Sequence, residues 1–180
     1  MRYDKNMVKN AVIGGGAAGL ACAVMLARAG REVLLLERGD RLGRKLSATG
    51  NGQGNVTNAH VSPDRYFSDD RNAVARVLAR FSWEDAVRFL ESMGGVFLPD
   101  TRGRVYPAGR QASAVTDLLR RELARLGVSV QTGARVTALS HDGGAFRIVW
   151  EGGETRAENV VLAAGGCAAP NFGTDGSAYA

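Results

Sequence analysis

The chain has 180 residues, enough for one domain with a core, and its composition (45% hydrophobic, 23% charged, net charge +5) is ordinary for an α/β protein. No apolar run reaches the roughly 20 residues that span a bilayer, and the charged first ten residues lack the apolar core of a secretory signal. The chain has two cysteines, Cys22 and Cys167, which are far apart and lack the spacing of metal ligands, so the sequence argues against a metal site and against a disulfide-rich secreted protein. Together, these features lead us to expect a cytoplasmic protein without a membrane partner.

The first third of the chain predicts a strand, a helix and a second strand. Residues 9–13 form an apolar strand, and 16–29 form a helix with Leu20, Ala23, Val24 and Ala27 on one face. Gly30 is a suitable C-terminal cap for this helix. Residues 33–36 are continuously apolar, as in a central parallel strand. The pattern is therefore that of a βαβ unit.

The middle of the chain is predicted to be loop, helix and a small hairpin. Residues 39–68 contain many Gly, Asn and Ser, and a loop this long in a compact domain is usually functional or disordered. The further elements are a helix from Asp69-Asp70 to about Arg80, a helix from the capping box of Ser82 and Asp85 to Met93, strands at 96–98 and 104–106 around a turn at 100–103, and a helix from a cap at Ser113 to Leu126.

The last third is predicted to be rich in strands. A short strand at 128–131 precedes three strands at 134–140, 145–150 and 154–156, which tight turns join into an antiparallel meander, and a separate buried strand covers 159–163. We therefore expect an α/β fold, a doubly wound Rossmann-like domain that binds FAD or NAD(P) and carries an antiparallel β-meander.

A dinucleotide fingerprint lies between the first strand and its helix. In Gly14-x-Gly16-x-x-Gly19, the glycines permit a tight turn, close approach of a pyrophosphate, and close packing of helix on strand. Glu37 ends the second strand, where a carboxylate accepts hydrogen bonds from ribose hydroxyls and repels a 2′-phosphate. The pattern favours FAD or NAD over NADP at this position.

A second glycine-rich segment follows Glu37. Gly43-Arg44-Lys45 is either a basic surface turn or a second approach of cations to the pyrophosphate. Thr49-Gly50-Asn51-Gly52 offers amides and exposed backbone to a flat polar ring, which suits FAD better than NAD.

The residues from Gly43 to Asn58 resemble a signature of the HI0933-like flavoproteins (the YhiN/BaiN type of FAD-dependent oxidoreductase). The family pattern is Gly-Arg-Lys-Leu, two residues, Thr-Gly-Asn-Gly-Arg-Cys-Asn, one residue and Thr-Asn. Here Gln53 and Gly54 replace the Arg and Cys. Further matches are Gly103-Arg104-Val105-Tyr106-Pro107, Ala112-Ser113, Val160 to Gly166, and Pro170 with Gly173.

The resemblance also implies an incomplete domain, because family members are about twice this length. Residues 1–180 would be the N-terminal part of the FAD-binding domain, without an inserted substrate domain and the returning C-terminal segment.

The resemblance implies a set of cofactor-binding residues. The glycine turn would line the pyrophosphate, Glu37 the ribose, the 44–55 segment the path to the flavin, and the backbone at Val136 the adenine. The full set is Gly14, Gly16, Ala17, Ala18, Gly19, Glu37, Arg38, Arg44, Lys45, Thr49, Gly50, Asn51, Asn55, Val136, Ala164 and Gly165.

No residue can be assigned as a catalytic acid, base or nucleophile. We expect His141 to be solvated and His60 to carry no chemistry. Tyr106 is either a proton donor near a flavin or, as we expect, a packed aromatic, while a flavin would carry the redox chemistry.

The function that the resemblance implies is hydride transfer through FAD, with NAD(P)H as reductant, to a conjugated C=C bond of a small molecule. Alternatives are reduction of a uridine in ribosomal RNA, amine oxidation, a non-catalytic fragment of such a flavoprotein, and a domain that binds NAD alone.

The basic residues leave the partner open. Six arginines fall between positions 102 and 125, which is either a solvated face or an attraction to an anionic partner. Few aromatics interleave with them, so the nucleic-acid signal is weak. The sequence gives no indication of the oligomeric state.

Overall fold

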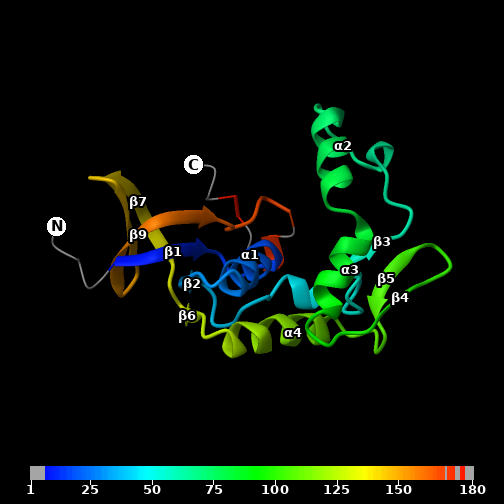
Figure 1. Ribbon diagram of the computed structural model, residues 1–180, viewed down its shortest axis with the longest axis horizontal. Helices are drawn as coiled ribbons and strands as arrows, with labels where there is room; N and C mark the ends of the chain where they lie inside the picture. The colour runs from blue at the N-terminus through cyan, green and yellow to red at the C-terminus, as the bar shows by residue number, and fades with distance from the viewer. Residues whose placement is uncertain (1–6, 169, 173–174, 177–180) are drawn as a thin grey trace. The chain divides into compact units, whose positions relative to one another are not determined.

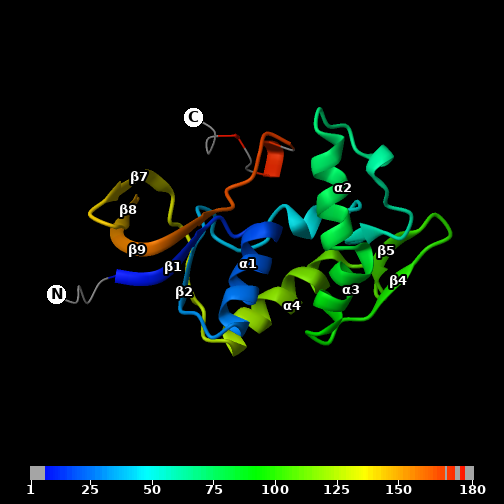
Figure 2. The ribbon, with the colours of Figure 1, turned by 45° about the horizontal axis from the view of Figure 1, so that its top comes forward.

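The computed structural model describes residues 7–168, 170–172 and 175–176, and Figures 1 and 2 show its helices and strands from two directions. Contacts within the chain divide it into two compact units. The first comprises residues 1–45 and 119–180, and the second comprises residues 46–118. Local patterns in the sequence do not predict this division.

A six-stranded sheet forms the first unit, in the order β6-β2-β1-β9-β8-β7. The strands are β1 (Met7–Ile13), β2 (Val33–Leu36), β6 (Ser129–Gln131), β7 (Val136–Asp142), β8 (Ala145–Trp150) and β9 (Gly153–Leu162). Strands β6, β2, β1 and β9 are parallel, whereas β7, β8 and β9 are antiparallel. The predicted α/β fold with a meander is confirmed.

Helix α1 (Ala17–Arg28) joins β1 to β2 and contacts both strands. Leu20, Ala23 and Val24 are completely buried on the helix, while Ala27 is partly exposed. Gly30 ends the turn with a φ of +72°, a left-handed conformation that glycine adopts without strain. The βαβ unit is thus confirmed.

Strand β9 corrects one prediction, because the expected strands at 154–156 and 159–163 are a single strand. Its first half pairs with β8 and its second half with β1. The predicted gap at residues 157 and 158 lies inside the strand, where Ala157 pairs with both Val8 and Phe146. Next to it, Glu158 pairs with Lys9, and Asn159 Nδ2 donates to Asn10 Oδ1 at 3.3 Å. These polar residues therefore support a strand that is shared by the meander and the parallel part of the sheet.

The second unit holds a three-stranded sheet in the order β3-β5-β4. Its elements are η1 (Leu46–Ala48), β3 (Thr57–Asn58), η2 (Pro63–Arg65), α2 (Arg71–Arg80), α3 (Trp83–Glu91), β4 (Phe97–Pro99), β5 (Arg104–Pro107) and the first half of α4 (Ala112–Arg125). One more short helix, η3 (Pro170–Phe172), belongs to the first unit.

Local capping fixes where the helices of the second unit begin. Asp70 accepts a hydrogen bond from Ala73 N at 2.8 Å, and Ser82 and Asp85 form the reciprocal capping box that the sequence predicts. Helix α3 ends at Glu91, two residues earlier than expected.

Ser113 is not the cap of α4, because this helix begins one residue earlier, at Ala112. The Ala112 N–H donates to the Gly52 carbonyl at 2.8 Å. This loop carbonyl satisfies an amide that the first turn leaves without a partner within the helix. Ser113 therefore lies inside the helix.

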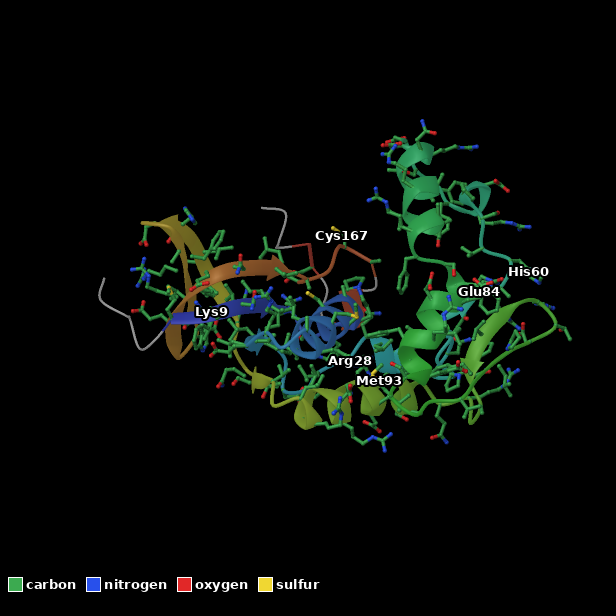
Figure 3. All side chains as sticks on the ribbon, viewed as in Figure 1. Lys9, Arg28, His60, Glu84, Met93 and Cys167 are labelled. Carbon is green, nitrogen blue, oxygen red and sulfur yellow. The ribbon has the colours of Figure 1, made fainter. Side chains whose placement is uncertain are left out.

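The second half of α4 belongs to the first unit, where its buried Glu122 binds two arginines. Glu122 accepts hydrogen bonds from Arg125 Nε at 2.7 Å and from Arg28 Nε at 2.8 Å. These bonds, Arg125 first, lower the pKa of Glu122 to about 2 despite its burial. Figure 3 shows Arg28 at the end of α1, so this ion pair ties α4 to α1.

Candidate functional site

A cavity lies in the first unit at the edge where β1, β2 and β9 end. Parallel strands place their carboxyl ends at one edge, which is where open α/β sheets bind ligands. Nine of the sixteen predicted residues line it: Gly14, Gly16, Glu37, Arg38, Arg44, Lys45, Val136, Ala164 and Gly165. The remaining lining residues are Ile13, Leu36, Ala134, Arg135 and Ala163.

The glycine turn is shaped by close backbone contacts. Gly14 has a φ of +110°, and a Cβ there would lie 2.4 Å from the Ala163 carbonyl oxygen. A Cβ on Gly19 would lie 1.8 Å from the Gly14 oxygen. A Cβ on Gly16, by contrast, would meet no atom within 4 Å. The first and third glycines are therefore needed for packing, while the second leaves its backbone open to the cavity.

The start of α1 offers amides to an anion. Gly16 is its N-cap, no side chain of the described part of the chain caps it, and the first turn has no acidic residue. Ala17 and Ala18 are exposed there. N–H groups at a helix start carry partial positive charge and bind phosphates. The terminus thus has the form of a phosphate cradle.

Glu37 lies at the end of β2 in the cavity wall. Its two carboxylate oxygens accept backbone hydrogen bonds, from Gly15 N at 2.6 Å and from Gly39 N at 2.7 Å. Each oxygen retains acceptor capacity. The backbone therefore holds the carboxylate in one orientation, with room to accept from hydroxyl groups.

Four cationic residues line the same cavity as this carboxylate. Arg38, Arg44 and Lys45 line the cavity, and Arg135, which no sequence pattern indicated, adds a fourth cation. Arg38 pairs with Asp175 at 2.8 Å, and Lys45 Nζ donates to the Ala168 carbonyl at 3.3 Å. Four cations to one lining carboxylate make the cavity suitable for a dianionic pyrophosphate.

Four predicted residues, Thr49, Gly50, Asn51 and Asn55, lie in the second unit. Thr49 Oγ1 donates to Leu46 O at 2.8 Å, and Asn51 has a φ of +54°, which asparagine tolerates. In the amide orientation that satisfies its hydrogen bonds, Asn55 donates to Thr57 O at 2.9 Å. These contacts shape a tight loop, and cofactor contact by these four residues remains a prediction.

Gln53 belongs to a cluster that sequence reasoning did not find. Its Oε1 accepts from Arg110 Nη1 at 3.2 Å, and the Arg110 guanidinium lies 4.8 Å from the centre of the Tyr106 ring. Arg110 has a φ of +47°, which is uncommon for a residue with a side chain. Arg110 thus supplies a cation beside the position where the resembled family has arginine.

Three other side chains that could carry chemistry lie outside the lining of this cavity: Tyr106, His141 and Cys22. Tyr106 is buried, and the His141 ring packs edge-on against Phe146 at 4.8 Å. Cys22 is partly buried in α1, and desolvation raises the pKa of its thiol. No group of three His, Cys, Asp or Glu side chains able to hold a metal is found within 7–168, 170–172 and 175–176. In the same residues, no helix has the length and apolarity needed to cross a membrane.

Known proteins resemble this chain over nearly its whole length. A reductase of Clostridium scindens, the 3-dehydro-bile acid delta(4,6)-reductase, is 38% identical over 171 residues, which are 94% of this chain and 42% of that protein. The ribosomal RNA dihydrouridine synthase of Escherichia coli is 30% identical over 168 residues, covering 93% of this chain and 42% of that protein. The chain therefore spans about two fifths of the length of these curated relatives.

The fold is shared with solved structures at lower identity. The 3-ketosteroid-delta4-(5alpha)-dehydrogenase of Rhodococcus jostii RHA1 superposes with a TM-score of 0.66 at 20% identity, over 92% of this chain and 47% of that one. The model of the HI0933-like protein Rossmann domain matches residues 8–180. The chain belongs to the HI0933-like Rossmann domain family.

Proposed function

We propose that the cavity of the first unit binds FAD. The observation that carries this proposal is the cradle at Gly16, where an open backbone, an uncapped helix start and cationic side chains meet. The α1 amides, Arg44 and Lys45 would hold the pyrophosphate, and Glu37 would accept hydrogen bonds from the adenosine ribose. When bound, FAD would supply hydride transfer.

Several features support FAD at this site over NADP. The Glu37 carboxylate would repel the 2′-phosphate of NADP. Among the described residues that line the cavity, Glu37 is the one carboxylate, so it is the side chain that would accept hydrogen bonds from the ribose hydroxyls. The backbone near Val136 would border the adenine. If the domain bound NAD alone, a titration would show NAD binding and no FAD binding. Separate titrations with FAD and with NAD therefore distinguish the two alternatives.

For the whole protein, we propose an oxidoreductase that uses NAD(P)H to reduce a conjugated C=C bond of a small molecule. The 38% identical relative that is named a delta(4,6)-reductase supports this reaction class. In this account the residues of the cavity bind and orient the cofactor and exclude water from it.

A second candidate is reduction of uridine in ribosomal RNA. It is favoured by the 30% identical relative, whose name is ribosomal RNA dihydrouridine synthase. Both candidates add two hydrogen atoms to a C=C bond beside a carbonyl group, so one cofactor site could serve either reaction.

The test follows NADH and NADPH oxidation by the whole protein without oxygen, with a steroid-like enone, its saturated ketone, or unmodified ribosomal RNA. We expect NADH or NADPH to be oxidised in the presence of the enone and not in the presence of the saturated ketone. A gain of two hydrogen atoms in the RNA, without enone turnover, would support the second candidate. Cofactor binding without turnover of either acceptor would contradict both.

A further inference from the structure

The second unit contains a pocket that the cofactor proposal does not use. Asn58, His60, Val61, Arg65, Tyr66 and Arg102 line it. They come from three segments: the end of β3 with the chain after it, the end of the short helix η2 with the residue that follows it, and the turn between β4 and β5. Figure 3 shows His60 on the chain that follows β3.

Hydrogen bonds of Asn58 tie two of these segments together. Its Oδ1 accepts from His60 N at 2.8 Å, and its Nδ2 donates to Arg102 O at 3.4 Å. The backbone adds a bond from Ala59 N to Gly103 O at 2.7 Å. The His60 ring rests on Gly103, where a Cβ would come within 2.2 Å of it. The pocket wall is therefore built by specific contacts.

Two arginines, Arg65 and Arg102, give the pocket its positive charge. No ion pair or side-chain hydrogen bond of Arg65 or Arg102 occurs within the residues that the structure describes. Their acidic neighbours are engaged elsewhere: Asp100 binds Arg104, and Asp64 accepts from Ser62 Oγ at 3.2 Å. Neither carboxylate lines the pocket.

Two exposed guanidinium groups in one pocket suit a phosphate. Arginine presents a planar set of donors that binds phosphate oxygens in pairs, and two arginines match a dianion in charge. His60 adds a third side chain that can donate to the same anion.

Aromatic rings stand beside these arginines. Tyr66 lines the pocket with 44% of its surface exposed, and Phe67 next to it is fully exposed. An exposed aromatic ring beside arginines is the arrangement on which proteins stack nucleobases. The sequence showed few aromatics among the arginines at 102–125, but the fold places the exposed Tyr66 and Phe67 near Arg65 and Arg102.

We propose that this pocket binds a nucleotide, with its phosphate on Arg65 and Arg102 and its base against Tyr66. The pocket is separate from the proposed FAD cavity, because all of its residues belong to the second unit. Its choice of ligand rests on the proposed reductase function, in which NAD(P)H or ribosomal RNA takes part, whereas FAD binding at the first unit is tested by a separate titration. The same chemistry is offered by a single-stranded RNA segment and by the phosphorylated ribose of NADP(H).

The test measures dissociation constants of the whole protein for a uridine-rich single-stranded RNA and for NADP⁺ at fixed salt. The variant R65Q/R102Q removes the two pocket arginines. R31Q/R80Q is the matched control, since Arg31 and Arg80 are exposed and line neither cavity. Flavin content and thermal unfolding report whether each variant is folded.

We expect R65Q/R102Q to weaken one ligand at least tenfold while R31Q/R80Q weakens it no more than twofold. Loss confined to RNA identifies an RNA strand, and loss confined to NADP⁺ identifies the dinucleotide. Equal loss in both variants would mean that net charge alone attracts the ligand and would overturn the proposal. So would the absence of binding of either ligand to the unmodified protein.

Tyr66 gives a second, independent variant. Tyr66→Phe retains the ring and should bind within twofold of the unmodified protein, whereas Tyr66→Leu should bind at least threefold more weakly. Equal affinity of the two variants would overturn the stacking role of Tyr66.

Discussion

Glu37 is the residue whose replacement tests the ribose contact. Glu37→Ala should weaken FAD binding by about 1 to 3 kcal/mol, the range for a hydrogen bond to a charged group. It should also lower stability, because Gly15 N and Gly39 N lose their acceptor. The measurement is an FAD titration with a parallel denaturation curve. Asp40→Ala removes an exposed carboxylate three residues away and serves as control; unchanged FAD affinity in Glu37→Ala would rule out the ribose role.

The hydrogen bond between Gln53 and Arg110 can be tested by restoring the arginine that the family pattern has at position 53. In Gln53→Arg, two guanidinium groups would meet where Gln53 now accepts from Arg110. We expect the free energy of unfolding to fall by about 1 kcal/mol, the usual value of one hydrogen bond. Gln111→Arg adds the same charge at an exposed neighbour and should change stability far less. A more stable Gln53→Arg protein would contradict this contact.

At the residue scale, the sequence could reveal the glycine turn and Glu37 because their spacing along the chain follows from the βαβ unit itself. It could not reveal Arg135. This residue reaches the cavity because Gly133 N and Ala134 N bond to the carbonyls of Gly39 and Glu37, nearly one hundred residues earlier. Arg110 was missed for a similar reason, since its left-handed backbone is set by the surrounding fold.

At the element scale, the strand–turn–helix unit allows packing and binding to be separated. Gly19→Ala should destabilise the protein by about 1 to 3 kcal/mol, because its Cβ would press on the Gly14 carbonyl. Gly16→Ala should change stability by less than about 0.5 kcal/mol, as expected for an open position, and should weaken FAD binding. Thermal unfolding and FAD titration of both variants check this. A destabilised Gly16→Ala with normal FAD affinity would contradict the assignment.

The contact of α4 with α1 predicts a pH dependence of stability. The unfolded chain protonates Glu122 near its ordinary pKa, whereas the folded protein holds that pKa at about 2. The contribution is therefore complete above about pH 5 and is lost as the pH falls toward 2. Denaturation midpoints between pH 6 and 2 should decline in the unmodified protein and less steeply in Glu122→Gln. Equal slopes would contradict it, and Glu91→Gln, at an exposed helix position, serves as control.

Sequence periodicity was enough to predict some helices and strands, but not all of them. Apolar runs and capping residues placed β1, α1, β2 and α3 because these signals are local. The continuity of β9 depends on Glu158 and Asn159 contacting β1, some 150 residues away. The start of α4 depends on the Gly52 carbonyl. Neither contact can be predicted from the residues adjacent to it in the sequence.

At the scale of the whole molecule, the chain leaves the first unit after Lys45 and returns to it at Leu119. The predicted cofactor residues divide in the same way, between the cavity of the first unit and the loop from Thr49 to Asn55. Sequence patterns indicated a nucleotide-binding fold throughout, but a division into units depends on contact density, which periodicity does not report. The family match, in contrast, spans both units.

The most direct measurement is an equilibrium titration of the whole protein, freed of bound flavin, with FAD and separately with NAD⁺. We expect one FAD bound per chain, with affinity that falls in Gly16→Ala and Glu37→Ala and is unchanged in R65Q/R102Q. Binding of NAD⁺ without FAD, or FAD binding unaffected by the changes at Gly16 and Glu37, would contradict the assignment of this cavity.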